Sequence, residues 1–129
     1  MKLLIVSNDP LVRERCADRA ELRFVEGSHR DVLVTVRDLC QSGHCLLSHP
    51  LAGSVKPNET PYRSVLLSSD APGVDPVSVE LSGQAVLTAE KFGPVRRSWR
   101  EKELADFRLI DLTLIESALE SALADPHYF

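Results

Sequence analysis

The feature that most constrains the fold is a short aliphatic run, Leu3-Leu4-Ile5-Val6, followed at once by Asn8-Asp9-Pro10. The run does not alternate with polar residues, so it predicts a strand over residues 2–7 that is buried on both faces, as in parallel sheets. Asp9 and Pro10 then provide an N-cap and a first-turn proline for a helix. A doubly buried strand that leads directly into a helix is typical of α/β folds.

The next segment repeats this order of strand and helix. Gly27 ends an apolar stretch, and Ser28-His29-Arg30-Asp31 resembles a capping box with Asp in place of Glu. The helix that follows has an apolar face, and Gly43 stands where a left-handed C-terminal cap is expected. The face is formed by Val32, Val36, Leu39 and Cys40. We expect three further strands, over residues 22–26, 45–48 and 65–67.

The C-terminal half predicts two helical regions. Asp75-Pro76 repeats the N-cap and proline signal, and Gly93-Pro94 marks the end of the helix that this signal begins. A strand over residues 77–81 is the competing interpretation, which the continuing helical stripe from Leu81 to Phe92 disfavours. Ser98-Trp99-Arg100-Glu101 is a capping box that begins the second region. Asp111 is either a second N-cap within that region or part of one long helix.

These elements predict a single α/β domain over residues 1–129, built as a three-layer sandwich around a small, mostly parallel four-stranded sheet. A length of 129 residues suits one domain. The step from the third strand to the fourth contains no helix. That pair is therefore either joined by a crossover loop or antiparallel.

Composition excludes several classes of function. With 15 basic and 19 acidic side chains the net charge is −4, which disfavours binding to nucleic acid or to an anionic membrane. The first apolar run is too short for a signal peptide, and no stretch is long enough to span a bilayer, so we expect a cytoplasmic protein. The three cysteines are an odd number and cannot all pair within the chain.

Four stretches of the sequence resemble the GrdX family. They are VEGS at 25–28, LSHPLAGSVKPNETPY at 47–62, TAEKF at 88–92 and DFRLID at 106–111. Members of that family are small proteins encoded beside the glycine, sarcosine and betaine reductase genes of amino-acid-fermenting bacteria. The resemblance implies a setting in reductive amino-acid metabolism, with thiol and selenol chemistry that ends in an acyl phosphate. It implies no particular reaction and no catalytic residues.

Polar residues collect where the predicted strands end. Ligands of open α/β sheets bind at the carboxyl ends of the strands. Residues 49–63 form an unusually long segment without regular structure, and such segments usually carry function. We therefore expect a ligand site at this edge, formed by Asn8, Ser28, His49, Lys56, Asn58, Glu59, Thr60 and Arg63. The alternative is that these residues only cap helices and make turns.

Within this set, His49 is the candidate general acid or base, because histidine titrates near neutral pH. Lys56 or Arg63 would hold an anion. A buried structural role for His49 is the alternative. The cysteines and histidines of residues 40–49 follow a C-x3-H-C-x3-H spacing that is not a zinc pattern, so we expect no metal and no cofactor.

Two functions remain open. The first is an accessory protein that binds a small anionic metabolite or a partner protein, such as a component of glycine reductase, as the resemblance implies. The second is a small enzyme that acts on a carboxylate or phosphate ester with His49 as general acid or base. Leucines on more than one side of the last helix, including Leu112 and Leu123, further predict a homodimer.

Overall fold

The computed structural model of the chain describes residues 2–52, 60–93 and 98–124. Within these ranges it contains three strands and four helices. In chain order they are β1 (Leu3–Ser7), α1 (Pro10–Cys16), β2 (Glu21–Phe24), α2 (His29–Gln41), β3 (Ser64–Ser68), α3 (Pro76–Phe92) and α4 (Glu101–Ala124). In the same ranges, no helix has both the length and the apolar character needed to cross a bilayer.

The sheet has the order β2-β1-β3, with β1 in the centre. β2 runs parallel to β1, whereas β3 runs antiparallel, with Ser64 opposite Ser7 and Ser68 opposite Leu3. The α/β class is confirmed, but the predicted four-stranded, mostly parallel sheet is wrong. The described chain forms a mixed three-stranded sheet. The missing crossover helix before β3 is the physical reason, because a chain that returns without a crossover enters the sheet in the antiparallel direction.

The segment predicted as a third strand, residues 45–48, makes only one isolated bridge to β3, between Leu46 and Leu67. Two of its N–H groups, those of Leu47 and Ser48, donate to the same carbonyl of Leu66. The Ser48 hydroxyl accepts the Leu66 N–H, which a carbonyl of a neighbouring strand would otherwise accept. A side chain thus takes the place of a ladder bond, and Pro50 follows directly. The pattern of apolar residues could not reveal the loss of this strand, because it does not show which backbone group a serine side chain will bond.

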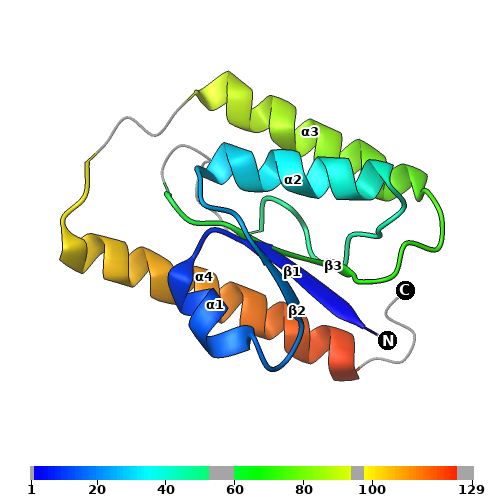
Figure 1. The fold of residues 1–129 in the computed structure, drawn as a ribbon. Helices are drawn as coiled ribbons and strands as arrows, with labels where there is room; N and C mark the ends of the chain where they lie inside the picture. The colour runs from blue at the N-terminus through cyan, green and yellow to red at the C-terminus, as the bar shows by residue number, and fades with distance from the viewer. Residues whose placement is uncertain (1, 53–59, 94–97, 125–129) are drawn as a thin grey trace.

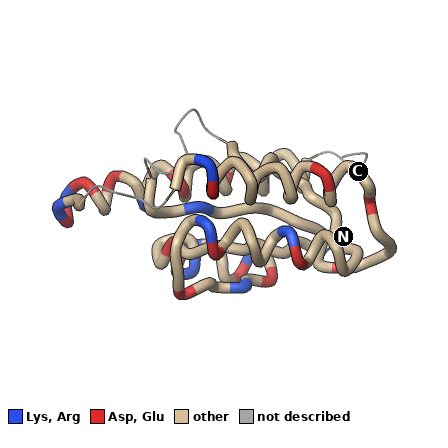
Figure 2. The backbone as a smooth tube through the Cα atoms, turned by 90° about the horizontal axis from the view of Figure 1, so that it is seen from above, with Lys and Arg blue, Asp and Glu red and all other residues tan. Residues whose placement is uncertain are grey.

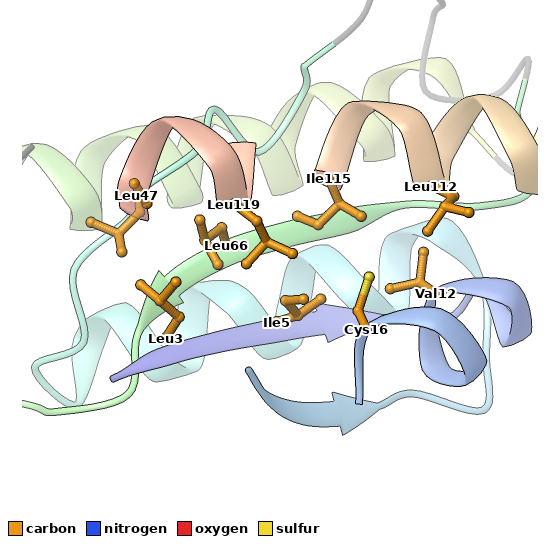
Figure 3. Packing of buried hydrophobic residues seen from close by; sticks show 10 residues of the cluster. Leu3, Ile5, Val12, Cys16, Leu47, Leu66, Leu112, Ile115 and Leu119 are labelled. Carbon is orange, nitrogen blue, oxygen red and sulfur yellow. The ribbon is translucent and has the colours of Figure 1, made fainter. Parts of the chain in front are cut away.

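Helices cover both faces of the sheet (Figure 1). One face packs against α1 and α4, and the other packs against α2, with α3 lying mainly on α2. Figure 3 shows how side chains from β1, β3, α1 and α4 meet on the first face. The labelled residues of that cluster are Leu3, Ile5, Val12, Cys16, Leu47, Leu66, Leu112, Ile115 and Leu119. On the second face Leu4 and Val6 pack against Val32, Val36 and Cys40.

The predicted helix signals act as capping groups. The Asp9 and Asp75 side chains accept backbone N–H groups at the starts of α1 and α3, each directly before a proline. Ser28 and Asp31 form both bonds of a capping box on α2. Gly43 has the positive φ expected of a residue that ends a helix, +109°.

The last helix differs from the prediction at its start. The expected box from Ser98 to Glu101 is displaced by two residues, because the Arg100 N–H donates to Glu103 and the Leu104 N–H donates to the Arg100 carbonyl. From there α4 continues as one helix through Asp111 to Ala124.

Burial along α4 predicts where its substitutions are costly. Leu119 is 1% exposed and lies in the core, whereas Leu123, one turn later, is 67% exposed. We expect Leu119→Ala to lower the free energy of unfolding by about 2–5 kcal/mol. Leu123→Ala, the matched control, should change it by less than about 0.5 kcal/mol. Urea denaturation measures both, and equal effects would contradict the packing of α4 on the sheet.

Candidate functional site

The mixed sheet brings three chain segments together at one edge. β1 and β2 end there, and β3 begins there because it is antiparallel. The first residues of α2 and the segment that leads into β3 meet the end of β1. The polar residues of this edge are therefore contributed by parts of the sequence more than fifty positions apart, such as Asn8 and Arg63.

The Asn8 side chain joins these segments. Its Nδ2 group donates to the carbonyl of Gly27, at 3.1 Å, and to the carbonyl of Pro61, at 2.8 Å. Its Oδ1 atom accepts the backbone N–H of Arg63, at 2.8 Å. Three hydrogen bonds to backbone groups fix the approach to α2 and the approach to β3 relative to the end of β1.

Arg63 is a buried cation at the centre of this edge, with 4% of its surface exposed. Its Nε group donates to Nε2 of His29, at 2.9 Å, and Nη1 donates to the carbonyl of Ala52. Burial, with the nearby Arg63 charge, lowers the pKa of His29 to about 3. His29 is therefore neutral, and because Nε2 accepts, its proton is on Nδ1.

Two buried carboxyl groups, Asp9 and Asp111, lie next to one another at this edge, and Asp111 is close enough to Arg63 for the two charges to interact. Asp9 Oδ1 accepts the Leu11 N–H at 2.9 Å. Oδ2 is buried and meets no N–H or O–H group of the described residues, but the Asp111 carboxyl is within hydrogen-bonding reach. Two carboxyls form a hydrogen bond only if one of them holds a proton. Burial, then the charge of Asp111 and the bond to it, raises the pKa of Asp9 to about 8.

Two serines continue the network from the second carboxyl. The Ser64 hydroxyl lies 2.7 Å from Oδ2 of Asp111 and 2.7 Å from the Ser7 hydroxyl, which in turn accepts the Asp9 N–H at 2.9 Å. Since a carboxylate only accepts, Ser64 donates to Asp111 and Ser7 donates to Ser64. Burial raises the pKa of Asp111, partly offset by the Ser64 bond, the Asp9 bond and the Arg63 charge. A polar network of this kind holds β1, β3 and α4 together.

The structure brings together some of the residues expected at the site. Asn8, Thr60 and Arg63 are buried at the edge. Ser28 lies beside them, one residue from the Gly27 carbonyl that Asn8 contacts, but its hydroxyl caps α2. His49 is exposed, and its Nδ1 atom accepts the Leu51 N–H at 3.0 Å in a local turn. Three expected ligand-binding residues lie outside the described residues: Lys56, Asn58 and Glu59.

Sequence reasoning left His29 and Ser64 out of the expected ligand site, and it missed the pairing of Asp9 with Asp111. A signal for Asp111 was present, because it stands four residues before Ile115 and eight before Leu119, both in the apolar stripe of the last helix. An acidic residue on a core-facing stripe predicts a buried carboxyl with a partner. The identity of that partner depended on the direction of β3, which the sequence left open.

Two cavities lined by described residues lie at the opposite edge. One, of about 420 Å³, is lined in part by Arg23, His44 and Ser69. The other, of about 480 Å³, is lined in part by Asp18 and Leu123. Neither contains the buried ionisable groups that functional sites concentrate, so the carboxyl edge remains the candidate site.

The acid pair makes the stability of the fold depend on pH. Asp9 binds a proton with a pKa of about 8 when folded, against an ordinary value of 3.8. Between these values the folded chain holds more protons, so the free energy of unfolding falls as the pH rises toward 8. Asp9→Asn keeps the cap and has no proton to lose. At pH 8 we expect the free energy of unfolding of Asp9→Asn, measured by urea denaturation, to exceed that of the parent chain by about 1 kcal/mol or more.

Asp75→Asn is the matched control, because Asp75 caps α3 before a proline on the other side of the sheet from Asp111. It should leave the pH profile of the parent unchanged. Identical pH profiles for Asp9→Asn and the parent chain would mean that Asp9 and Asp111 do not share a proton.

Comparison with known proteins gives one match. No curated protein and no solved structure matches the chain. A family model described as GrdX-like protein matches residues 4–120. This range includes all the described site residues named above, and among the helices and strands it leaves out only the first residue of β1 and the last four residues of α4. This chain belongs to the GrdX-like protein family.

Proposed function

We propose that this chain is an accessory protein that binds a small oxyanion metabolite, a carboxylate or a phosphate, at the carboxyl edge of its sheet. The setting that we propose is reductive amino-acid metabolism of the glycine reductase type, which rests on the family resemblance. Arg63 is the residue that would hold the anion, and Asn8 and His29 would position it.

The observation that carries this proposal is the set of partners that Arg63 has. Both of its described side-chain hydrogen bonds go to neutral acceptors, the imidazole of His29 and the carbonyl of Ala52. No carboxylate of the described residues lies within salt-bridge distance of the guanidinium, and Asp111 acts on it only as a nearby charge. A buried cation is costly without a paired anion, so an oxyanion ligand would relieve this cost.

The position of Arg63 also favours a bound oxyanion over a solvent-exposed contact. Its Nε and Nη1 groups are held by the protein, so the plane of the guanidinium is fixed before a ligand arrives. A fixed guanidinium loses little conformational entropy when it binds, and it offers two parallel N–H groups to a carboxylate or a phosphate. Binding at a prepared group of this kind needs no large rearrangement.

The alternative function, a small enzyme with His49 as general acid or base, has weaker support. Catalysis would need His49 beside a carboxylate and a cleft that excludes water. In the described residues the only hydrogen bond of its ring is the local one to Leu51. The Asp9 carboxyl at this edge is directed to Leu11 and Asp111. We therefore favour binding without chemistry.

A ligand screen by thermal shift tests the proposal. The panel is glycine, sarcosine, betaine, acetyl phosphate and inorganic phosphate. A ligand at 100 times its Kd stabilises the folded state by about 2.7 kcal/mol, which for a chain of this size raises Tm by several degrees. We expect at least one member to do so. The amino-acid members separate carboxylate recognition from phosphate recognition.

A pair of conservative variants shows whether Arg63 is responsible. Arg63→Lys keeps the charge but loses the planar pair of donors, so the ligand-induced rise in Tm should fall by more than half. Arg37→Lys, at an exposed ion pair with Asp38 on α2, should leave the rise unchanged. No rise with any member of the panel, or an equal rise in both variants, would contradict the proposal.

A further inference from the structure

A cavity of about 420 Å³ lies beside the edge strand β2, away from the candidate site. The two faces of β2 differ in what covers them. Leu22 packs against the core between the sheet and the α1–α4 layer, and the Arg13 guanidinium lies 4.0 Å from the centre of the Phe24 ring. Glu21 and Arg23 alternate with these residues, and both are exposed and line the cavity. One face of β2 is therefore apolar and covered, whereas the other is charged and open to the cavity.

The register of the sheet places both charged side chains on the α2 side. Glu21 stands opposite Leu4 in the ladder, and Arg23 stands opposite Val6. Both partners pack in the cluster that β1 and β3 form with α2. Leu39, in the last turn of α2, lines the cavity together with Leu4. Since residues two apart on a strand project from the same face at a spacing of about 6–7 Å, the carboxylate and the guanidinium stand side by side above an apolar floor.

Glu21 and Arg23 carry opposite charges but do not pair with each other. The ion pairs among the described residues join other side chains, and even Arg19, which lines the neighbouring cavity, pairs with Glu116. The Ser69 hydroxyl donates to Oε2 of Glu21 and so holds that carboxylate in place. A carboxylate and a guanidinium that face one cavity without meeting leave room for a molecule that carries both charges.

His44 adds an acceptor near Glu21. Its Nδ1 atom lies 2.8 Å from the carbonyl oxygen of Ser68. Because a carbonyl only accepts, Nδ1 holds the proton, and the neutral ring has its acceptor at Nε2. Ser69, the next residue, bonds Glu21, so the imidazole and the carboxylate are both anchored where β3 ends. Arg23 stands two residues further along β2. The cavity thus has acceptors toward one end and a donor group toward the other.

We propose that this cavity binds a free α-amino acid with an aliphatic side chain, in its zwitterionic form. The ammonium group donates to Glu21 and His44, and the carboxylate accepts from the Arg23 guanidinium. The aliphatic side chain rests on Leu4 and Leu39, which line the cavity between these polar groups. The site is separate from the carboxyl edge and does not depend on the function proposed there.

The charges around the cavity favour a zwitterion over a simple ion. Figure 2 shows Lys and Arg interspersed with Asp and Glu along the described chain, so a field of one sign does not favour an anion or a cation. A simple carboxylate would pair with Arg23 but would desolvate Glu21 without giving it a partner. A simple amine would do the reverse. Only a ligand with both charges pairs both side chains, and charged groups without partners are costly to desolvate.

A purely protective role for these charges explains less of the geometry. Charged side chains on an edge strand discourage pairing with another chain. That role accounts for Glu21 and Arg23, but it requires neither a cavity nor the contributions of Leu39 and His44, which come from outside the strand. A volume of about 420 Å³ is in the range of small-molecule sites.

Isothermal titration calorimetry of the full chain with L-leucine tests the proposal. Two probes of similar shape each lack one charged group: isocaproate has no ammonium, and isoamylamine has no carboxylate. We expect a Kd for L-leucine of about a millimolar or lower. Either probe should bind roughly tenfold more weakly or worse, because it loses charge-assisted hydrogen bonds. No binding of L-leucine at about 10 mM, or equal binding of either probe, would overturn the proposal.

Substitutions on β2 show whether the charged pair holds the ligand. Arg23→Gln and Glu21→Gln should each raise the Kd of L-leucine by roughly tenfold or more. Arg15→Gln is the matched control, because Arg15 is equally exposed but lies on α1, on the other side of the sheet. It should leave the Kd unchanged. All three substitutions are at exposed positions, so circular dichroism should report an unchanged fold. Equal effects of Arg23→Gln and Arg15→Gln would contradict the site.

Arg63→Lys separates this cavity from the carboxyl edge. In a chain with this substitution that circular dichroism shows to be folded, L-leucine should bind with the parent Kd. Loss of L-leucine binding there would mean that the amino acid binds at the carboxyl edge through its carboxylate, and would overturn the assignment to the cavity. The ligand screen for the carboxyl edge is read from the response of Arg63, so either proposal can fail without the other.

Discussion

Burial of β1 on both faces is the constraint on which the rest of this structure depends. Ile5 and Val6 point to opposite sides of the sheet and have no exposed surface. Each fully buried aliphatic side chain of this size contributes about 1.5–3 kcal/mol, and this gain requires helices on both sides. The pairs α1–α4 and α2–α3 satisfy that requirement. Because the sheet has only three strands, its central strand supplies core residues to both layers.

A strand buried in this way must also bury its end. Ser7, Asn8 and Asp9 follow the apolar run directly and are at most 8% exposed. Polar groups without water need partners from the protein, and these come from Ser64, Arg63 and Asp111. The candidate site is thus built from the groups that the fold needs in order to end β1 inside the molecule. A network that ends the strand also fixes Arg63, so the structural and the binding interpretations of this edge are linked.

Local signals carried most of what could be predicted. The helix starts at Asp9, Ser28 and Asp75 follow from side chains that bond backbone groups two or three residues away. Such bonds can be predicted from a few neighbouring residues of the sequence. The direction of β3 follows from the missing crossover helix before it, and the loss of the third strand involves a hydrogen bond between Ser48 and Leu66, eighteen residues apart. The pairing of Asp9 with Asp111 spans about a hundred residues, and it could be predicted only once the direction of β3 was known. Non-local polar contacts have no period that a single sequence could reveal.

The length of α4 exceeds what the core alone requires. The residues that cover the sheet run from Asp111 to Ala122, and a helix of that length would complete the core. The ten residues before Asp111 are held instead by side-chain contacts within the chain, because Trp99 packs on the Phe107 ring and Arg108 donates to the Tyr62 hydroxyl. A helix is extended at a cost only where something packs against it. The contact with Tyr62 ties the start of α4 to the segment that leads into β3, whose Pro61 carbonyl also accepts from Asn8, so the extension and the candidate site are joined at one end of the fold.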